Sequence, residues 1–168
     1  MLKTTLLTTA IALSSIASAE PYWQEASQGT VGPSPVYVHS VGGSPEYVCQ
    51  VGAAGGYIPG VLSPGNRFCT FIHWGGHRST TYRVLQDPHG DLMWINKNSF
   101  DPRIHELFLG GWKASRPSLY ICRPDHDRYG YRYAGALEGD AGNGVCFLPN
   151  FYGQQDQTFD YEVLVYRP

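Results

Sequence analysis

The strongest constraint on this chain of 168 residues is that one pattern of residues occurs twice in the same order. The landmarks of the first copy are Trp23, Gly42-Gly43, Tyr47-Val48-Cys49, Gly60, Cys69 and the segment from Tyr82 to Leu85. Those of the second copy are Trp94, Gly110-Gly111, Tyr120-Ile121-Cys122, Gly135, Cys146 and the segment from Tyr161 to Leu164. Because the order is kept and only short insertions separate the copies, we predict one supersecondary unit that is used twice.

The composition indicates strands rather than helices within each unit. The chain has 20 Gly, 12 Pro and 14% aromatic residues, with no long stretch of apolar residues at helical spacing. Its clearest strand alternates, with Phe159, Tyr161, Val163 and Val165 on one side, so we expect one face of it to meet a core. We therefore predict an all-β protein, with two tandem antiparallel β repeats packed by pseudo-twofold symmetry into one globular body. The first repeat covers residues 20–88 and the second covers residues 89–168.

The first 19 residues are typical of a secretory signal peptide. Lys3 is followed by an apolar stretch from Leu6 to Ile16 and then by Ala17-Ser18-Ala19. The apolar stretch is shorter than the roughly 20 residues that span a bilayer. We expect cleavage near Ala19 and a secreted or periplasmic protein with no membrane span.

The four cysteines occupy matched positions in the two copies, and an exported chain is permitted to form disulfides. Four cysteines allow three pairings. If each repeat folds as a unit, the pairing that keeps both bridges inside their units joins Cys49 to Cys69 and Cys122 to Cys146. Each bridge would stabilise the fold by roughly 3 kcal/mol, and bridged sulfurs supply no nucleophile.

A pair of charged residues in the second copy also predicts structure. Arg123 and Glu162 occupy the positions that Gln50 and Arg83 occupy in the first copy. The complementary charges lead us to expect that these positions are neighbours across adjacent strands.

The order of these short motifs resembles the DM-nine repeat family. The likeness rests on Gly110-Gly111, the segment from Leu119 to Arg123, the segment from Tyr161 to Val165 and the matching residues of the first copy, including Pro59-Gly60 and Gly75-Gly76. The resemblance implies an all-β tandem repeat and a lectin-like role. Members of this family include mannose-binding proteins and modules attached to pore-forming domains of the natterin type, for which this chain is too short.

The charged positions that the resemblance assigns to mannose binding differ in this chain. The family's lysine after the Pro-Gly turn is replaced by Val61 in the first copy and by Ala136 in the second. The family's aspartate after the glycine pair is replaced by Lys113 in the second copy, and the first copy has Ser44-Pro45 there. Mannose binding is therefore not expected to carry over unchanged.

Aromatic side chains beside polar ones are the alternative means of binding a sugar, because pyranose faces stack on aromatic rings. The predicted ligand-binding residues are Trp112, Lys113, Trp74, His77, Arg78 and Tyr131. In a structural interpretation, the two tryptophans instead pack between the sheets, and the tyrosines around Tyr131 cover a sheet face.

Catalysis and metal binding have little support in the sequence. The chain has no Gly-x-Ser-x-Gly and no His-Glu-x-x-His motif. His73 and His77 would stand about 13 Å apart on one extended strand, and the segment from Asp125 to Asp127 lacks the spacing of a calcium loop. We expect no enzyme activity, no catalytic residue, no metal and no cofactor, with an unrecognised hydrolase as a third interpretation.

The balance of charge excludes one class of partner, since a net charge of -2 with scattered Lys and Arg gives no footprint for nucleic acid. The sequence thus predicts a secreted, non-catalytic, lectin-like binding protein whose partner is a glycan or glycoprotein, and it leaves a homodimer open. The alternative is a secreted protein-interaction or effector protein with no sugar binding.

Overall fold

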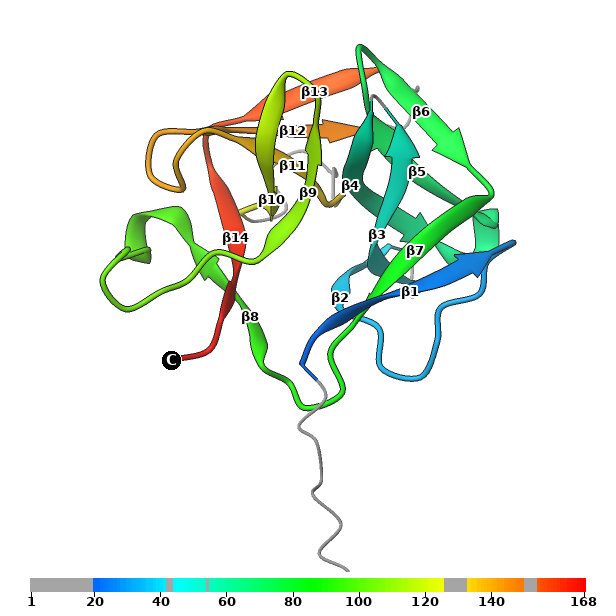
Figure 1. The fold of residues 1–168 in the computed structure, drawn as a ribbon, viewed down its shortest axis with the longest axis horizontal. Coiled ribbons are helices and arrows are strands. Elements are labelled where there is room, and N and C mark those ends of the chain that lie inside the picture. Colours follow the sequence, from blue (N-terminus) through cyan, green and yellow to red (C-terminus); the bar gives the residue numbers. More distant parts are fainter. Residues whose placement is uncertain (1–19, 42–43, 54, 126–132, 150–153) are drawn as a thin grey trace, which may run out of the picture.

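The computed structural model describes residues 20–41, 44–53, 55–125, 133–149 and 154–168, which form fourteen β-strands and two short 3-10 helices (Figure 1). The strands join into one antiparallel sheet, so the predicted all-β fold class is confirmed. The predicted signal peptide lies outside the described residues. Within the described residues, no helix is long and apolar enough to cross a membrane.

The first seven strands belong to the first copy of the sequence pattern. They are β1 (Tyr22–Ser27), β2 (Tyr37–Val41), β3 (Ser44–Ala53), β4 (Gly56–Ser63), β5 (Phe68–Ile72), β6 (Gly76–Ser79) and β7 (Thr81–Gln86). The other seven belong to the second copy. They are β8 (Leu92–Asn96), β9 (Leu109–Lys113), β10 (Arg116–Pro124), β11 (Gly135–Glu138), β12 (Val145–Pro149), β13 (Gln155–Thr158) and β14 (Tyr161–Tyr166). The predicted boundary at residue 88 falls between β7 and β8.

The strand pairing of the first half is repeated in the second half. In the first half β1 pairs with β7, β3 pairs with β2, β4 and β7, and β5 pairs with β4 and β6. In the second half β8 pairs with β14, β10 pairs with β9, β11 and β14, and β12 pairs with β11 and β13. The match extends to register, since Cys49 faces Gly60 and Val84 just as Cys122 faces Gly135 and Val163.

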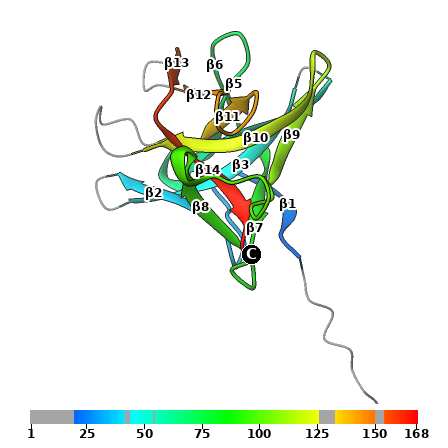
Figure 2. The same cartoon turned by 90° about the vertical axis from the view of Figure 1, so that its left-hand side faces the viewer.

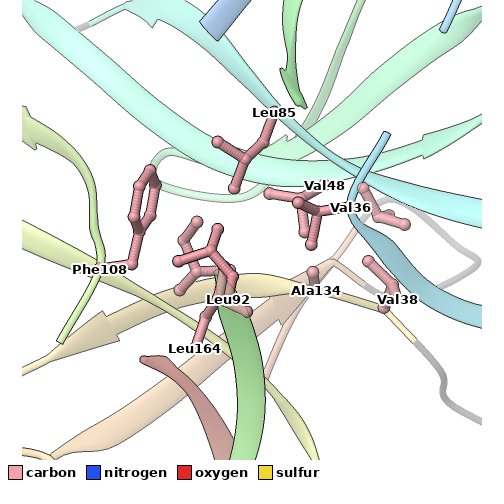
Figure 3. Packing of buried hydrophobic residues seen from close by; sticks show 10 residues of the cluster. Val36, Val38, Val48, Leu85, Leu92, Phe108, Ala134 and Leu164 are labelled. Atoms are coloured by element: carbon pink, nitrogen blue, oxygen red, sulfur yellow. The ribbon is translucent and has the colours of Figure 1, made fainter. Parts of the chain in front are cut away.

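The two halves meet in a shared core (Figure 3). Val36, Val38, Val48, Val61 and Leu85 come from the first half, and Leu92, Phe108, Ile121, Ala134 and Leu164 come from the second. Several members are counterparts in the two copies. The Val36 N–H donates to the Leu85 carbonyl, as the Phe108 N–H does to the Leu164 carbonyl. The halves therefore pack together through equivalent surfaces, as pseudo-twofold symmetry requires.

Each disulfide lies in a further buried cluster, and the cluster around the first disulfide also includes Leu119 and Ala136 from the second half. Cys49 is bonded to Cys69 and Cys122 to Cys146, with Cα–Cα distances of 6.1 and 5.9 Å, so the predicted pairing is confirmed. Tyr82 and Tyr161 are buried at matched places, and burial raises the pKa of both phenols. These two cores account for the landmarks that the copies share.

The last strand differs from its prediction because both of its faces are buried. Tyr161, Val163 and Val165 fill the core of the second half, whereas Leu164 on the opposite face lies in the shared core. Phe159 lies before the strand begins and is 58% exposed. A strand between two cores shows no clean alternation of apolar and polar residues.

The expected neighbours Arg123 and Glu162 are directly paired across β10 and β14. Arg123 Nε lies 2.5 Å from Glu162 Oε2, and the guanidinium also donates to the Val38 carbonyl at 2.6 Å. Gln50 and Arg83 are paired in the same way in the first half. The prediction of cross-strand neighbours is confirmed, and the arginine additionally joins the second half to the first.

A close backbone approach explains the glycine landmark in each copy. A Cβ added at Gly135 would lie 1.9 Å from the Phe147 carbonyl oxygen, and one at Gly60 would lie 2.1 Å from the Thr70 carbonyl oxygen. Such distances are well inside van der Waals contact, so any side chain here would push the neighbouring strand away.

We predict that Gly135→Ala lowers the free energy of unfolding by about 1–3 kcal/mol because β11 and β12 must separate. Gly142→Ala is the matched control, because a Cβ there meets nothing within 4 Å, and it should change stability by less than about 0.5 kcal/mol. Chemical denaturation of the oxidised protein measures both. Equal effects of the two substitutions would contradict this account.

Candidate functional site

A cleft of about 490 Å³ lies where the two halves face one another. Its first wall comes from β4, the end of β5 and the turn that follows β5. Its second wall comes from β9 to β13 and the turn between β9 and β10. β12 and β13 lie beside β5 and β6 in both views (Figures 1 and 2). Because both halves supply walls, the cleft exists only in the assembled fold.

The inner surface of the cleft is apolar and well packed. Ile58, Leu119 and Ala136 line it and also belong to the buried cluster around the Cys49–Cys69 disulfide, to which both halves contribute. Ile72 and Phe147 extend the same surface. A surface built on close-packed core residues is rigid, so the cleft is largely preformed.

The charged part of the cleft is a group of three side chains from the second half. Lys113 Nζ lies 2.5 Å from Glu138 Oε1, and Arg116 Nε lies 3.4 Å from Glu138 Oε2. Lys113 and Arg116 face each other across β9 and β10, and Glu138 ends the adjacent β11. The Lys113 and Glu138 side chains are only 22% and 19% exposed, so solvent screens this ion pair less than a surface pair. Arg116 is 54% exposed.

Trp74 lies at the mouth of the cleft with its side chain in solvent. It is 92% exposed, in the turn between β5 and β6, and its φ is +56°. The His73 N–H donates to the Gly75 carbonyl at 2.9 Å and closes the turn. A bulky residue at positive φ is uncommon and costs roughly 1–2 kcal/mol. The turn thus presents the indole to solvent at an energetic cost, and it does not pack Trp74 between the sheets.

Trp112 has a different position, because it does not line the cleft. Its ring lies edge-on to Tyr57 at 5.0 Å, where β4 and β9 join the two halves. A Cβ at Gly111 would lie 2.1 Å from the Tyr57 carbonyl oxygen, so glycine permits this close crossing. Trp112 remains 43% exposed and helps to join the halves.

Two other predicted ligand-binding residues also lie away from the cleft. His77 packs against Phe71 with ring centroids 5.7 Å apart, and the Arg78 guanidinium lies 4.6 Å from the centre of the Phe68 ring. Tyr131 is outside the described residues, and its neighbour Tyr133 packs against the shared core. The structure therefore brings together Trp74 and Lys113 of the six predicted residues.

Sequence reasoning missed Arg116 and Glu138. A signal for Glu138 was present, because it follows Ala136 by two residues and so shares its face of β11. Arg116 carries no comparable signal. It reaches the cleft because the hairpin of β9 and β10 places it opposite Lys113.

The two histidines considered as metal ligands do not lie on one extended strand. The chain reverses between Ile72 and Gly76, which pair with each other, and the rings of His73 and His77 are 6.4 Å apart. The described residues contain no group of three or more His, Cys, Asp or Glu side chains that could hold a metal ion. The segment from Asp125 to Asp127 lies mostly outside the described residues.

The fold and the cleft define a class of protein, an all-β chain of two similar halves with a cleft between them. The sequence matches no family model and no curated protein. A solved structure with a similar fold is the nematode sperm cell motility protein MFP2B, with a TM-score of 0.61 and 16% sequence identity. The match covers 88% of this chain and 44% of that protein, so the chain spans less than half of its length. At this identity the likeness shows the fold alone.

We predict that Trp74→Gly raises the free energy of unfolding by about 1 kcal/mol, because glycine adopts positive φ without strain. Trp74→Ala is the matched control. It removes the same exposed ring but keeps a Cβ, so its stability should stay within about 0.5 kcal/mol of the parent. Denaturant midpoints measure both variants. A loss of stability in Trp74→Gly would show that the indole stabilises the fold.

Proposed function

We propose that this chain is an exported, non-catalytic protein that binds a saccharide in the cleft between its halves. The observation that carries the proposal is the exposed Trp74 beside a cleft that contains the Lys113, Glu138 and Arg116 group. At 92% exposure the indole buries little surface that would offset the cost of the strained turn. Unfavourable backbone conformations of this kind are concentrated at ligand-binding sites.

The chemistry of the cleft suits a sugar ring. The indole offers a flat apolar face to the C–H groups of a pyranose, and the apolar inner surface excludes water around the ring. The Glu138 carboxylate accepts hydrogen bonds from hydroxyl groups, and Lys113 and Arg116 donate them. A cleft of about 490 Å³ lies in the size range of small-molecule sites.

The resemblance to DM-nine repeats supports the same location. Lys113 and Ala136 occupy the positions that the resemblance assigns to the sugar-binding aspartate and lysine, and both line the cleft. In this chain the cationic side chain is Lys113 and the anionic one is Glu138, so the charges are arranged differently from those of the family's mannose-binding members. We therefore expect the cleft to bind a saccharide other than mannose.

The absence of catalysis is part of the proposal. Glycoside hydrolysis normally uses two carboxylates on either side of the scissile bond. The side chains that line the described cleft include one carboxylate, Glu138, and it is paired with Lys113. This arrangement favours binding over hydrolysis.

Export is supported by the two disulfides, which persist in oxidising compartments. The residues that precede the described structure have the pattern of a signal peptide, with cleavage expected near Ala19. Both features favour a secreted or periplasmic protein.

The test is a glycan array probed with the oxidised protein from Glu20 onward, followed by calorimetry of any saccharide that binds. We expect Trp74→Ala to weaken binding at least about tenfold, because the sugar loses its stacking surface. Trp112→Ala is the matched control outside the cleft and should leave the affinity within about twofold of the parent.

Folding of each variant is checked first by near-ultraviolet circular dichroism. Binding that survives Trp74→Ala but is lost in Trp112→Ala would move the site to the crossing of β4 and β9. A blank array with folded protein would favour the alternative, a secreted protein-interaction or effector protein.

A further inference from the structure

The charge of the cleft is the feature that the proposed function leaves unexplained. Among the residues that line it, Lys113 and Arg116 are cationic and Glu138 is anionic. The cleft therefore carries one positive charge in excess, in a chain whose net charge is -2. A site for a neutral sugar has no need of this excess.

The excess charge is located on Arg116. Glu138 is held by Lys113 at 2.5 Å in a pair that is mostly buried, so its charge is already balanced. The closest approach of Arg116 to the same carboxylate is 3.4 Å, from Nε. A guanidinium has five N–H donors, and within the described part of the chain this contact is the ion pair that Arg116 makes.

A ligand that fills the cleft changes the surroundings of Arg116. The side chain is 54% exposed, and a bound saccharide would remove part of its hydration. Covering a charge without a partner is unfavourable, whereas an anionic substituent would replace the lost water with charge-assisted hydrogen bonds. A planar guanidinium also matches a carboxylate or sulfate in a bidentate geometry.

We infer that the ligand is an acidic saccharide, whose carboxylate or sulfate binds Arg116 while its ring stacks on Trp74. This inference rests on the proposed function, since it names the class of saccharide that the same cleft binds. Glu138 lowers the affinity for such a ligand and orients Lys113. An acidic peptide offers the same charge, but its extended backbone has no flat apolar ring face for the exposed indole.

The test is isothermal titration calorimetry at 150 mM NaCl with trigalacturonate and with its methyl ester, which has the same rings without the charges. A sulfated oligosaccharide is the second anionic probe, so the two arms distinguish a carboxylate from a sulfate. We expect at least one anionic probe to bind about tenfold or more tightly than the methyl ester. A glutamate tripeptide that is acetylated at its N-terminus and amidated at its C-terminus carries the same number of carboxylates and should bind no more tightly than the methyl ester.

Two substitutions in the cleft should have opposite effects. Arg116→Gln should remove the preference for the acidic probe, because it removes the excess charge. Glu138→Gln should strengthen binding of the acidic probe at least about threefold. A gain in affinity is not produced by a damaged fold. Arg103→Gln removes an equal charge from a residue that is paired with Asp101 outside the cleft, and it should change nothing.

The outcomes separate the two proposals. The protein could bind trigalacturonate, its methyl ester and the sulfated probe with equal affinity and lose all three in Trp74→Ala. This result would overturn the inference of an acidic ligand and support a saccharide site in the cleft. Failure of every saccharide to bind would overturn both proposals. A preference for acid that persists in Arg116→Gln, or falls equally in Arg103→Gln, would overturn its assignment to Arg116. Equal binding of the glutamate tripeptide would make the ligand an acidic peptide.

Discussion

The shared core is the interaction on which the rest of the structure depends. Each half contributes five buried side chains to it, and in the first half these are Val36, Val38, Val48, Val61 and Leu85. Full burial of one such side chain stabilises a fold by about 1.5–3 kcal/mol. Five of them contribute about 7.5–15 kcal/mol, which is comparable with the roughly 5–15 kcal/mol that is typical of the net stability of a whole domain. A separated half would expose this surface, so the halves stabilise each other although each has its own disulfide.

The framework of the two halves is repeated, but the charged wall of the cleft, in the described residues, is not. Where strand pairing or a disulfide dictates a residue, the copies agree, as at Gly60 and Gly135. At positions in the walls of the cleft that neither constraint dictates, the two copies differ. Glu138 corresponds to Ser63, whose hydroxyl donates to the buried carboxylate of Glu46 at 2.6 Å. The first half therefore has a hydrogen-bonded polar group at the place where the second half has a charged wall. The fold constrains the framework and leaves the walls of the cleft free to differ.

The sequence contained enough to predict the fold class, the disulfides and the neighbours Arg123 and Glu162, because a repeat shows the same spatial relation twice. The sequence contained less information about which residues line the cleft. The position of Trp74 depends on a turn that reverses the chain within a few residues, and Glu138 and Arg116 line the same cleft from the other half. Comparing the two copies gives no information on such contacts, because they join unlike parts of the repeat.

The division of the cleft between the halves has a thermodynamic consequence. Trp74, His73 and Ile58 belong to the first half, and Lys113, Arg116 and Glu138 belong to the second. A molecule bound between them contacts both and has no comparable site on the unfolded chain. Occupancy at a hundredfold excess over the dissociation constant would add about 2.7 kcal/mol to the stability of the fold. The ligand would then act as a further link between the two copies, alongside the core that they share.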